Sequence, residues 1–404
     1  MTGSPARTLT PSELEWLTVR SYLTEHRYDL GVAAGENHPP GRRLAGTPLL
    51  AAPAWQPPAP VPLQDISLEL TGAHPRPAAD VQASTDVQAS TPLLPERADG
   101  TRYCRYSEAM GELAAPLVFE NRTTYRLTDA DLTSRPPRLV FTTGRYFDGI
   151  DVGEAAAHEY AAERLGGPAS GRRSVGRRSV GPRSVGLRSA GLRSAGLRER
   201  FADPCDLRRR PANLAISTLT LRLDRRLGRA RFLLHWRDPA KVGHAGGLYQ
   251  VVPVGVFQPS GEAPWNRQHD FSLWRCMVRE FAEELGGHLE DYASDSGPVD
   301  YDSWPFARQL TDALDRGQVR VWCLGLGTDP LTYATDLLTV AVIDSDLFDA
   351  LFGKSLERNA EGEILPAREF AAHVIDRTVT GEPVQAAGAA LLRLAWQHRD
   401  TLGG

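Results

Sequence analysis

The chain has 404 residues, 41% of them hydrophobic and 24% charged, and its formal net charge at pH 7 is −4. This composition supports a sizeable core in two or three domains and gives no overall case for nucleic-acid binding. No apolar run approaches the roughly 20 residues of a membrane span, and the N-terminus lacks a secretory signal, so we expect a cytoplasmic protein. The four scattered cysteines form no CxxC pair, which argues against zinc or a disulfide framework. The Ala, Arg, Gly and Pro bias is typical of a GC-rich bacterial genome.

Residues 1–100 are expected to form a Pro/Ala-rich N-terminal extension with one helix and a low-complexity loop. Ser12 and Glu15 are spaced as a capping box, which predicts a helix ending near residue 26. Its apolar spacing directs Leu14, Leu17 and Tyr22 inward and leaves Trp16 and Arg20 elsewhere. The proline-rich stretch 39–62 is expected to be extended, 63–71 to be a strand, and the tandem DVQAST repeat at 80–91 to be a disordered loop.

Residues 101–166 are expected to be a strand–strand–helix unit packed on the core. The pattern predicts a helix at 106–113, strands at 117–127 and 138–147, and a helix within 148–164. His158 and Glu159 could begin the zinc motif HExxH, but the position of its second histidine holds Ala162. We therefore interpret His158 as a structural residue.

Residues 167–200 contain a pentapeptide repeat that begins GRRSV and carries eight arginines and no acid over 172–198. A period of five matches neither helix nor strand burial, and the recurring glycine favours a flexible loop. One interpretation is a surface loop expanded by slippage. The other is an electrostatic tether to nucleic acid or an acidic partner.

Residues 201–404 are expected to form the main domain, which ends in helices. Alternating residues predict a hairpin of strands 214–223 and 229–238, a strand at 248–257 and a second hairpin of strands 319–327 and 335–344. The loop of the second hairpin, 328–334, is positioned to reach a substrate. Helices are predicted at 306–316, 345–353, 366–376 and 383–399, and 288–304 is acidic and irregular.

The stretch 274–287, WRCMVREFAEELGG, reads as an amphipathic helix that ends at a glycine pair. Its apolar stripe consists of Trp274, Met277, Val278, Phe281 and Leu285. Glu280, Glu283 and Glu284 lie together on another side, where three carboxylates repel one another unless a cation neutralises them. Oxygen ligands of this kind suit Mg²⁺ or Mn²⁺.

This stretch resembles the Nudix hydrolase family, whose box core is Arg-Glu-apolar-x-Glu-Glu-x-Gly, here residues 279–286. The full box places Gly-x5-Glu-x7 before the arginine. In this chain Gly255 and Glu262 are one residue too far apart, and sixteen residues rather than seven separate Glu262 from Arg279. The metal-binding half of the box is thus intact, and its loop half carries an insertion. The likeness covers about 35 residues of the chain and implies a Nudix-like α/β/α sandwich around a mixed sheet, with additional N- and C-terminal elements.

The resemblance implies hydrolysis of a nucleoside diphosphate linked to another group, with Mg²⁺ or Mn²⁺ as cofactor. Glu283 and Glu284 would be metal ligands, Glu280 a ligand or the base, and Arg279 the residue that orients Glu280. Gly255 would let the loop approach the metal, and Glu262 or Asp270 would support the cluster. Weaker candidates for contact with the nucleotide-type substrate are Arg237, His244 and Tyr249.

Two other functions stay open on the sequence alone. The domain could be a Nudix-like ligand sensor or regulatory module without turnover, which the displaced Glu262 and the insertion favour. Alternatively, the arginine repeat could make the chain a nucleic-acid-associated regulator. A homodimer is possible, whereas substrate identity cannot be read from the box, because selectivity in such a fold resides in loops outside it.

Overall fold

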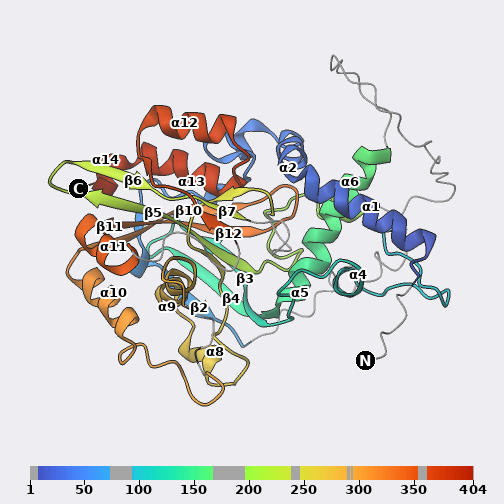
Figure 1. Ribbon diagram of the computed structural model, residues 1–404, viewed down its shortest axis with the longest axis horizontal. Coiled ribbons are helices and arrows are strands. Elements are labelled where there is room, and N and C mark those ends of the chain that lie inside the picture. Colours follow the sequence, from blue (N-terminus) through green and yellow to red (C-terminus); the bar gives the residue numbers. More distant parts are fainter. Residues whose placement is uncertain are drawn as a thin grey trace.

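We describe a computed structural model that covers residues 8–72, 93–166, 196–237, 246–288, 292, 294–353 and 362–403 (Figure 1). The DVQAST repeat, most of the arginine repeat and His244 lie outside these residues. No helix in the described ranges is long and apolar enough to cross a membrane.

The helices are α1 (Pro11–Glu25), α2 (Arg27–Glu36), α4 (Tyr106–Leu113), α5 (Tyr146–Gly149), α6 (Ala155–Gly166), α7 (Leu197–Arg200), α8 (Asn266–His269), α9 (Leu273–Glu280), α10 (Pro305–Asp315), α11 (Ser345–Phe352), α12 (Ala372–Gly381), α13 (Ala386–Gln397) and α14 (Arg399–Gly403). Two π-helical turns are η5 (Ile150–Glu154) and η6 (Phe281–Leu285), and short 3₁₀ turns are η1 (Pro40–Arg42), η2 (Leu44–Gly46), η3 (Pro53–Trp55) and η4 (Leu63–Asp65).

The strands are β1 (Val61–Pro62), β2 (Ser67–Leu70), β3 (Thr123–Asp131), β4 (Arg138–Arg145), β5 (Leu214–Asp224), β6 (Arg229–Phe232), β7 (His235–Arg237), β8 (Tyr249–Gln250), β9 (Val254–Val256), β10 (Val319–Thr328), β11 (Thr335–Asp344), β12 (Gly362–Ile364) and β13 (Arg368–Glu369).

The main sheet is mixed and runs in the order β1-β10-β11-β5-β6-β13, with β9 also paired to β5. β5 and β11 are parallel at its centre, and the other pairs are antiparallel. Both predicted hairpins are confirmed, because β5 pairs with β6 and β10 pairs with β11. Their long alternating stretches of valine, leucine and threonine are what a buried strand requires.

Helices cover the main sheet on both sides, with α12 and α13 on one face and α9, α10 and α11 on the other (Figure 1). The α13 sequence AAGAALLRLAWQ is buried along most of its length, as a helix lying on the middle of a sheet must be. The fold is therefore a mixed α/β structure, as the sequence predicts.

A second sheet, in the order β2-β4-β3, packs on the main domain. The ring of Tyr125 on β3 lies 4.5 Å from that of Phe257, and the ring of Phe141 on β4 lies 5.5 Å from that of Phe271. These rings are part of the same hydrophobic core as the main sheet. β3 begins at Thr123, later than the predicted start at 117.

The single N-terminal helix of the prediction is in fact two helices, α1 and α2, and its start was misplaced. The capping box joins Thr10 to Glu13, not Ser12 to Glu15. The buried face carries Glu13, Trp16 and Arg20, while Leu14 is 52% exposed. The apolar residues alone predicted the wrong buried face of α1, because the face that is buried also carries charged side chains with hydrogen-bond partners.

The stretch 39–62 is also more structured than the predicted extended chain. It forms the turns η1, η2 and η3, buries Leu49 and Trp55 in the main core, and ends in β1, which joins the main sheet. Prolines favour the first position of such turns, since their missing N–H is not needed there. The N-terminal residues are thereby built into the domain.

Three further predictions need correction. The expected strand 248–257 is divided between β8 and β9, which belong to different sheets. The expected strand 229–238 likewise ends at Phe232 and resumes as β7 in the small sheet β12-β7-β8. The expected helix 366–376 begins as strand β13, and α12 starts only at Ala372.

A buried ion cluster joins the N-terminal helices to η5. The Glu154 carboxylate is bound by Arg20 of α1, and it accepts hydrogen bonds of 3.0 and 2.9 Å from Arg27 of α2. All three side chains are less than a tenth exposed. Because a carboxylate inside a protein is stable only with such partners, this contact fixes both helices.

His158 of α6 lies beside this cluster, and its packing fits the structural role expected from the sequence. Its ring stacks on Trp16 at 5.1 Å, and its Nδ1 lies 3.1 Å from the Tyr106 hydroxyl. Burial, followed by the neighbouring charge of Arg20, lowers the pKa of His158 to about 3.

Replacement of Glu154 by glutamine should be strongly destabilising. Glu154→Gln removes the buried carboxylate that Arg20 and Arg27 share, and we expect a loss of about 3–5 kcal/mol in the free energy of unfolding. Urea unfolding measures this. The control Glu25→Gln, on the exposed side of α1, should change stability by less than about 0.5 kcal/mol. Equal effects of the two variants would contradict the role of the cluster.

The low pKa of His158 predicts a pH dependence of stability. Between pH 6.5 and about 3 the unfolded chain binds a proton at this residue and the folded chain does not. Stability should therefore fall as the pH falls through this window, by up to about 1.4 kcal/mol per pH unit from this residue. His158→Gln should flatten the profile of unfolding free energy between pH 7 and 5, and the exposed His373→Gln should not.

Candidate functional site

The helix with the three glutamates is confirmed, with a change in its last turn. α9 starts after Ser272, whose Oγ accepts a hydrogen bond of 3.3 Å from the Arg275 N–H. It continues as the π-helical turn η6, which carries Glu283 and Glu284, and the chain leaves it through Gly287 at a φ of +68°. The positive φ explains the glycine. Wide π turns of this kind are frequent at functional sites.

The predicted apolar stripe faces the core. Met277, Val278, Phe281 and Leu285 are buried, while Trp274 is half-buried and donates from its indole N–H to Thr311 at 3.0 Å. The opposite side of the helical segment presents the carboxylates to β9 and to the loop after η6. The amphipathic pattern was therefore sufficient to place the helix.

Glu280 lies against Gly255 of β9. Gly255 pairs with Ile216 of β5, and a Cβ added to it would lie 1.8 Å from the Glu280 Cδ atom. Any side chain at this position would occupy the space of the carboxylate. The structure thus brings together two residues that the sequence separates by 25 positions, and gives a reason for the glycine.

Glu284 is 7% exposed, and both of its oxygens have partners. One accepts a hydrogen bond of 2.8 Å from the Val254 N–H, and the other lies 3.4 Å from Nδ1 of His235. The carboxylate favours the tautomer with hydrogen on Nδ1. His235 is fully buried on β7, and its Nε2 has no hydrogen-bond partner within the described ranges. Sequence reasoning missed His235, and the signal for it was a polar residue inside the apolar run RFLLHW.

Glu283 faces the loop that follows η6. Its Oε1 accepts a hydrogen bond from the Tyr292 hydroxyl, and the pKa of Tyr292 is raised by burial and by that carboxylate. Tyr292 therefore stays protonated and remains a donor. Its ring lies 5.5 Å from Trp304, so an aromatic group that the sequence analysis did not identify borders the carboxylates.

Arg279 has a different role from the predicted one. Instead of orienting Glu280, its guanidinium donates to the Gln258 carbonyl at 2.6 Å and to the Tyr301 hydroxyl. Its Nη1 also lies 3.5 Å from Asp270 Oδ1. Desolvation opposes the charge, but the surrounding groups raise the pKa of Arg279 overall. The arginine therefore ties the helix to the loop that leads into it.

The two predicted supporting carboxylates lie in different places. Asp270 is fully buried and accepts hydrogen bonds from the Ser260 N–H at 2.8 Å and from Tyr301 at 2.9 Å, close to Arg279. Glu262 is half exposed and binds Thr123 and Arg145 of the second sheet. Asp270 thus supports the helix through Arg279, and Glu262 holds the inserted segment to β3 and β4.

The candidate substrate residues Arg237 and Tyr249 lie on the small sheet. Arg237 follows His235 by two positions on β7, so both side chains point to the same side, and its Nη1 lies 3.3 Å from the Gln250 amide oxygen. Gln250 is directly opposite His235. Tyr249 packs on the main core, and its backbone N–H donates to the Pro383 carbonyl. Arg237 therefore lies on the same side of β7 as His235, the residue that contacts Glu284, and Tyr249 contributes to packing.

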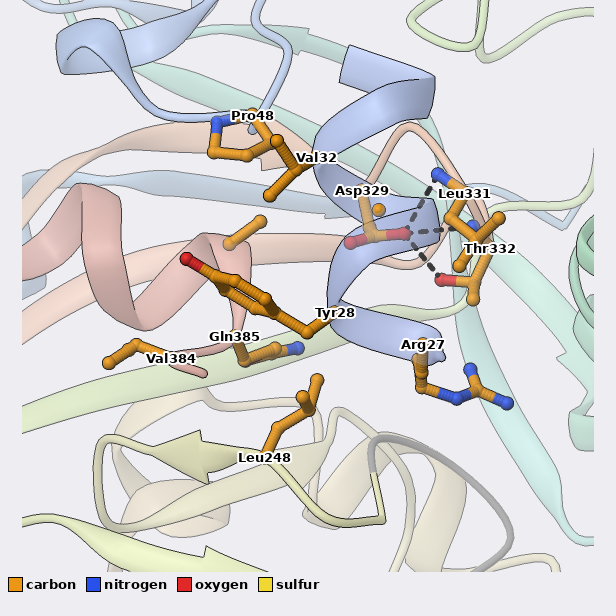
Figure 2. A pocket seen from close by; sticks show the side chains of 12 residues that line it. Arg27, Tyr28, Val32, Pro48, Leu248, Asp329, Leu331, Thr332, Val384 and Gln385 are labelled. Carbon is orange, nitrogen blue, oxygen red and sulfur yellow. Dashed lines mark hydrogen bonds between the residues drawn. The ribbon is translucent and has the colours of Figure 1, made fainter. Parts of the chain in front are cut away.

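The loop 328–334, expected to reach a substrate, is packed inside the protein. Leu331, Thr332 and Tyr333 are buried, and Asp329 accepts hydrogen bonds from the N–H groups of Leu331 and Thr332 (Figure 2). The loop lines a small cavity with α2, across which Tyr28 extends toward Val384 (Figure 2). None of the three box glutamates lines this cavity.

Carboxylate oxygens are the type of ligand that a hard divalent cation prefers. In the described part of the chain, however, no three His, Cys, Asp or Glu side chains converge on one point. Glu280, Glu283 and Glu284 are directed toward Gly255, Tyr292 and Val254 respectively.

Gly255→Ala should move the Glu280 carboxylate with little loss of stability. The three atoms nearest the new methyl group all belong to the end of the flexible Glu280 side chain, so the free energy of unfolding should change by less than about 1.5 kcal/mol. A crystal structure of the variant, or the chemical shift of the Glu280 carboxylate carbon, measures the displacement.

Gly153→Ala is the matched comparison. A Cβ there would lie 2.1 Å from the Thr332 carbonyl oxygen, which belongs to the backbone and cannot rotate away. We expect this variant to lose about 1–3 kcal/mol of stability or more. If Gly255→Ala left the Glu280 carboxylate unmoved, the close contact between the two residues would be disproved.

No model of a known protein family matches this chain, and no curated protein matches it. The functional proposal below therefore depends on the geometry just described.

Proposed function

We propose that the protein is a Nudix-like, metal-dependent hydrolase that acts on a nucleoside diphosphate-linked substrate. The observation that carries the proposal is the contact of Glu280 with Gly255, next to Glu283 and Glu284 on the following turn. The helix places these carboxylates against β9 at a position where the strand has a glycine and therefore no side chain. This arrangement resembles the one that the Nudix box implies.

In this proposal Glu280 and Glu283 hold Mg²⁺ or Mn²⁺, which would neutralise a diphosphate and lower the pKa of a nearby water. Glu284 acts chiefly through position, because the Val254 N–H and His235 fix its plane. Arg279 and Asp270 hold the loop between β9 and α9 in place, and this loop positions β9 against the helix. Arg237 is the residue for contact with a phosphate.

The alternative is a ligand-sensing or regulatory module of the same fold without turnover. A specific observation favours it, namely that Glu284 is nearly buried with both oxygens engaged and that Glu262 binds Arg145 on another sheet. A sensor needs only a nucleotide-type ligand to bind. The two functions differ in one measurable property, the release of product.

The double variant Glu283→Gln/Glu284→Gln should separate these functions. We expect calorimetric titration of the wild type to show Mg²⁺ or Mn²⁺ binding, and the double variant to lose at least roughly tenfold in affinity. Phosphate release from a panel of nucleotide sugars and dinucleotides should be detectable for the wild type and lost in the variant.

The matched control Glu15→Gln/Glu25→Gln removes two exposed glutamates of α1 and should leave metal binding unchanged. Binding of metal and nucleotide without turnover would favour the sensor. Absence of metal binding by the wild type, even with nucleotide present, would disprove the metal-dependent hydrolase.

A further inference from the structure

A second site lies at the far end of β5. The β5–β6 hairpin, α11 and residues 365–367 enclose a cleft of about 470 Å³, which is in the range of small-molecule sites. Its lining includes three arginines, Arg222, Arg229 and Arg231. Nothing in the proposed hydrolase mechanism uses these residues.

The arginines of this cleft are not neutralised evenly. Arg222 and Arg231 are directly opposite each other on β5 and β6, an arrangement in which like charges destabilise a sheet. Asp349 of α11 offsets the charge of Arg222 through hydrogen bonds of 2.8 Å and less. The Asp224 carboxylate instead accepts hydrogen bonds from the N–H groups of the turn at residues 226 and 227.

Arg229 and Arg231 each have a carboxylate opposite them in the sheet, Asp224 for Arg229 and Glu369 for Arg231, but neither of these two pairs forms an ion pair. Both arginines are exposed, both line the cleft, and neither side chain makes an ion pair or hydrogen bond with any described residue. Two adjacent guanidinium groups facing one cleft form a strong recognition site for a phosphate or carboxylate, because each can donate two parallel hydrogen bonds.

The remainder of the lining is apolar. Leu233 and Phe348 form a buried floor, and Leu227, which is 66% exposed, stands at the rim with Leu365. An exposed leucine beside two unpaired arginines matches a ligand that combines an anionic head with an apolar body. A purely inorganic anion would leave this apolar surface uncovered.

We propose that this cleft binds a small organic anion, with Arg229 and Arg231 holding its phosphate or carboxylate and Leu227 and Phe348 contacting its apolar part. The site is separate from the glutamates. Gly255 pairs with Ile216, whereas the cleft is at Arg222 on the same strand, six residues or about 20 Å further along. The proposal is thus independent of the hydrolase function.

Calorimetric titration with phenyl phosphate, in the presence of EDTA, tests the site. We expect the full-length protein to bind phenyl phosphate more tightly than inorganic phosphate, and benzyl alcohol to bind weakly or not at all. Arg229→Gln/Arg231→Gln should weaken phenyl phosphate binding by roughly tenfold or more, since two charge-assisted contacts are lost. The single charge reversal Arg231→Glu should have a similar effect.

Two controls make the result specific. Arg209→Gln/Arg377→Gln removes two exposed arginines outside the cleft and should change the affinity less than about twofold. Glu283→Gln/Glu284→Gln should retain binding, which separates this cleft from the hydrolase site. No binding of phenyl phosphate by the wild type, or an equal loss in the Arg209/Arg377 control, would overturn the proposal, as would loss of binding only in the glutamate variant.

Discussion

The parallel pairing of β5 with β11 is the constraint on which the rest of the structure depends. The two strands are in register from Leu214 opposite Thr335 to Leu223 opposite Asp344. Parallel neighbours need a long crossover, and here it contains β9, α9, α10 and β10. Two strands of this crossover are hydrogen-bonded to the central pair, β9 to β5 and β10 to β11, and α9 packs against β9.

The same pairing explains why the candidate site and the arginine cleft are apart. The first residues of β5 pair with β9, which places Gly255 and the glutamates at that end of the strand. The last residues of β5 pair with β6, which places the arginines at the other end. α11 spans the two regions. Phe348 lines the cleft, its neighbour Phe352 lies 5.2 Å from it, and Phe352 stacks at 5.9 Å on Phe281 of η6. A row of buried rings thus connects the cleft to the turn that holds Glu283 and Glu284.

The sequence predicted correctly the helices and strands whose buried residues recur at the spacing of a helix or strand. It failed where a buried face contains polar or charged side chains. Alternation in 214–223 and 335–344 was enough for β5 and β11, and the apolar stripe was enough for α9. The face of α1 was misjudged because Glu13 and Arg20 are buried with partners from distant segments. For the candidate site, the motif predicted Glu280, Glu283 and Glu284, but His235, Tyr292 and the true partners of Arg279 depend on contacts between strands and loops that no local pattern encodes.

For the Nudix-like site that we propose, these contacts explain how Gly255 and the glutamates come together. An insertion between the loop and the helix would ordinarily separate the glycine from the glutamates. Here Asp270 and Tyr301 bind Arg279, and Arg279 binds the Gln258 carbonyl just after β9, so the two ends of the inserted segment are held together at the helix. The inserted residues can then fold outward as α8 and be fixed by Glu262 to Arg145. The approach of Gly255 to Glu280 is thus supported by the buried Arg279 contacts, and the length of the intervening loop is compatible with the Nudix-like site that we propose.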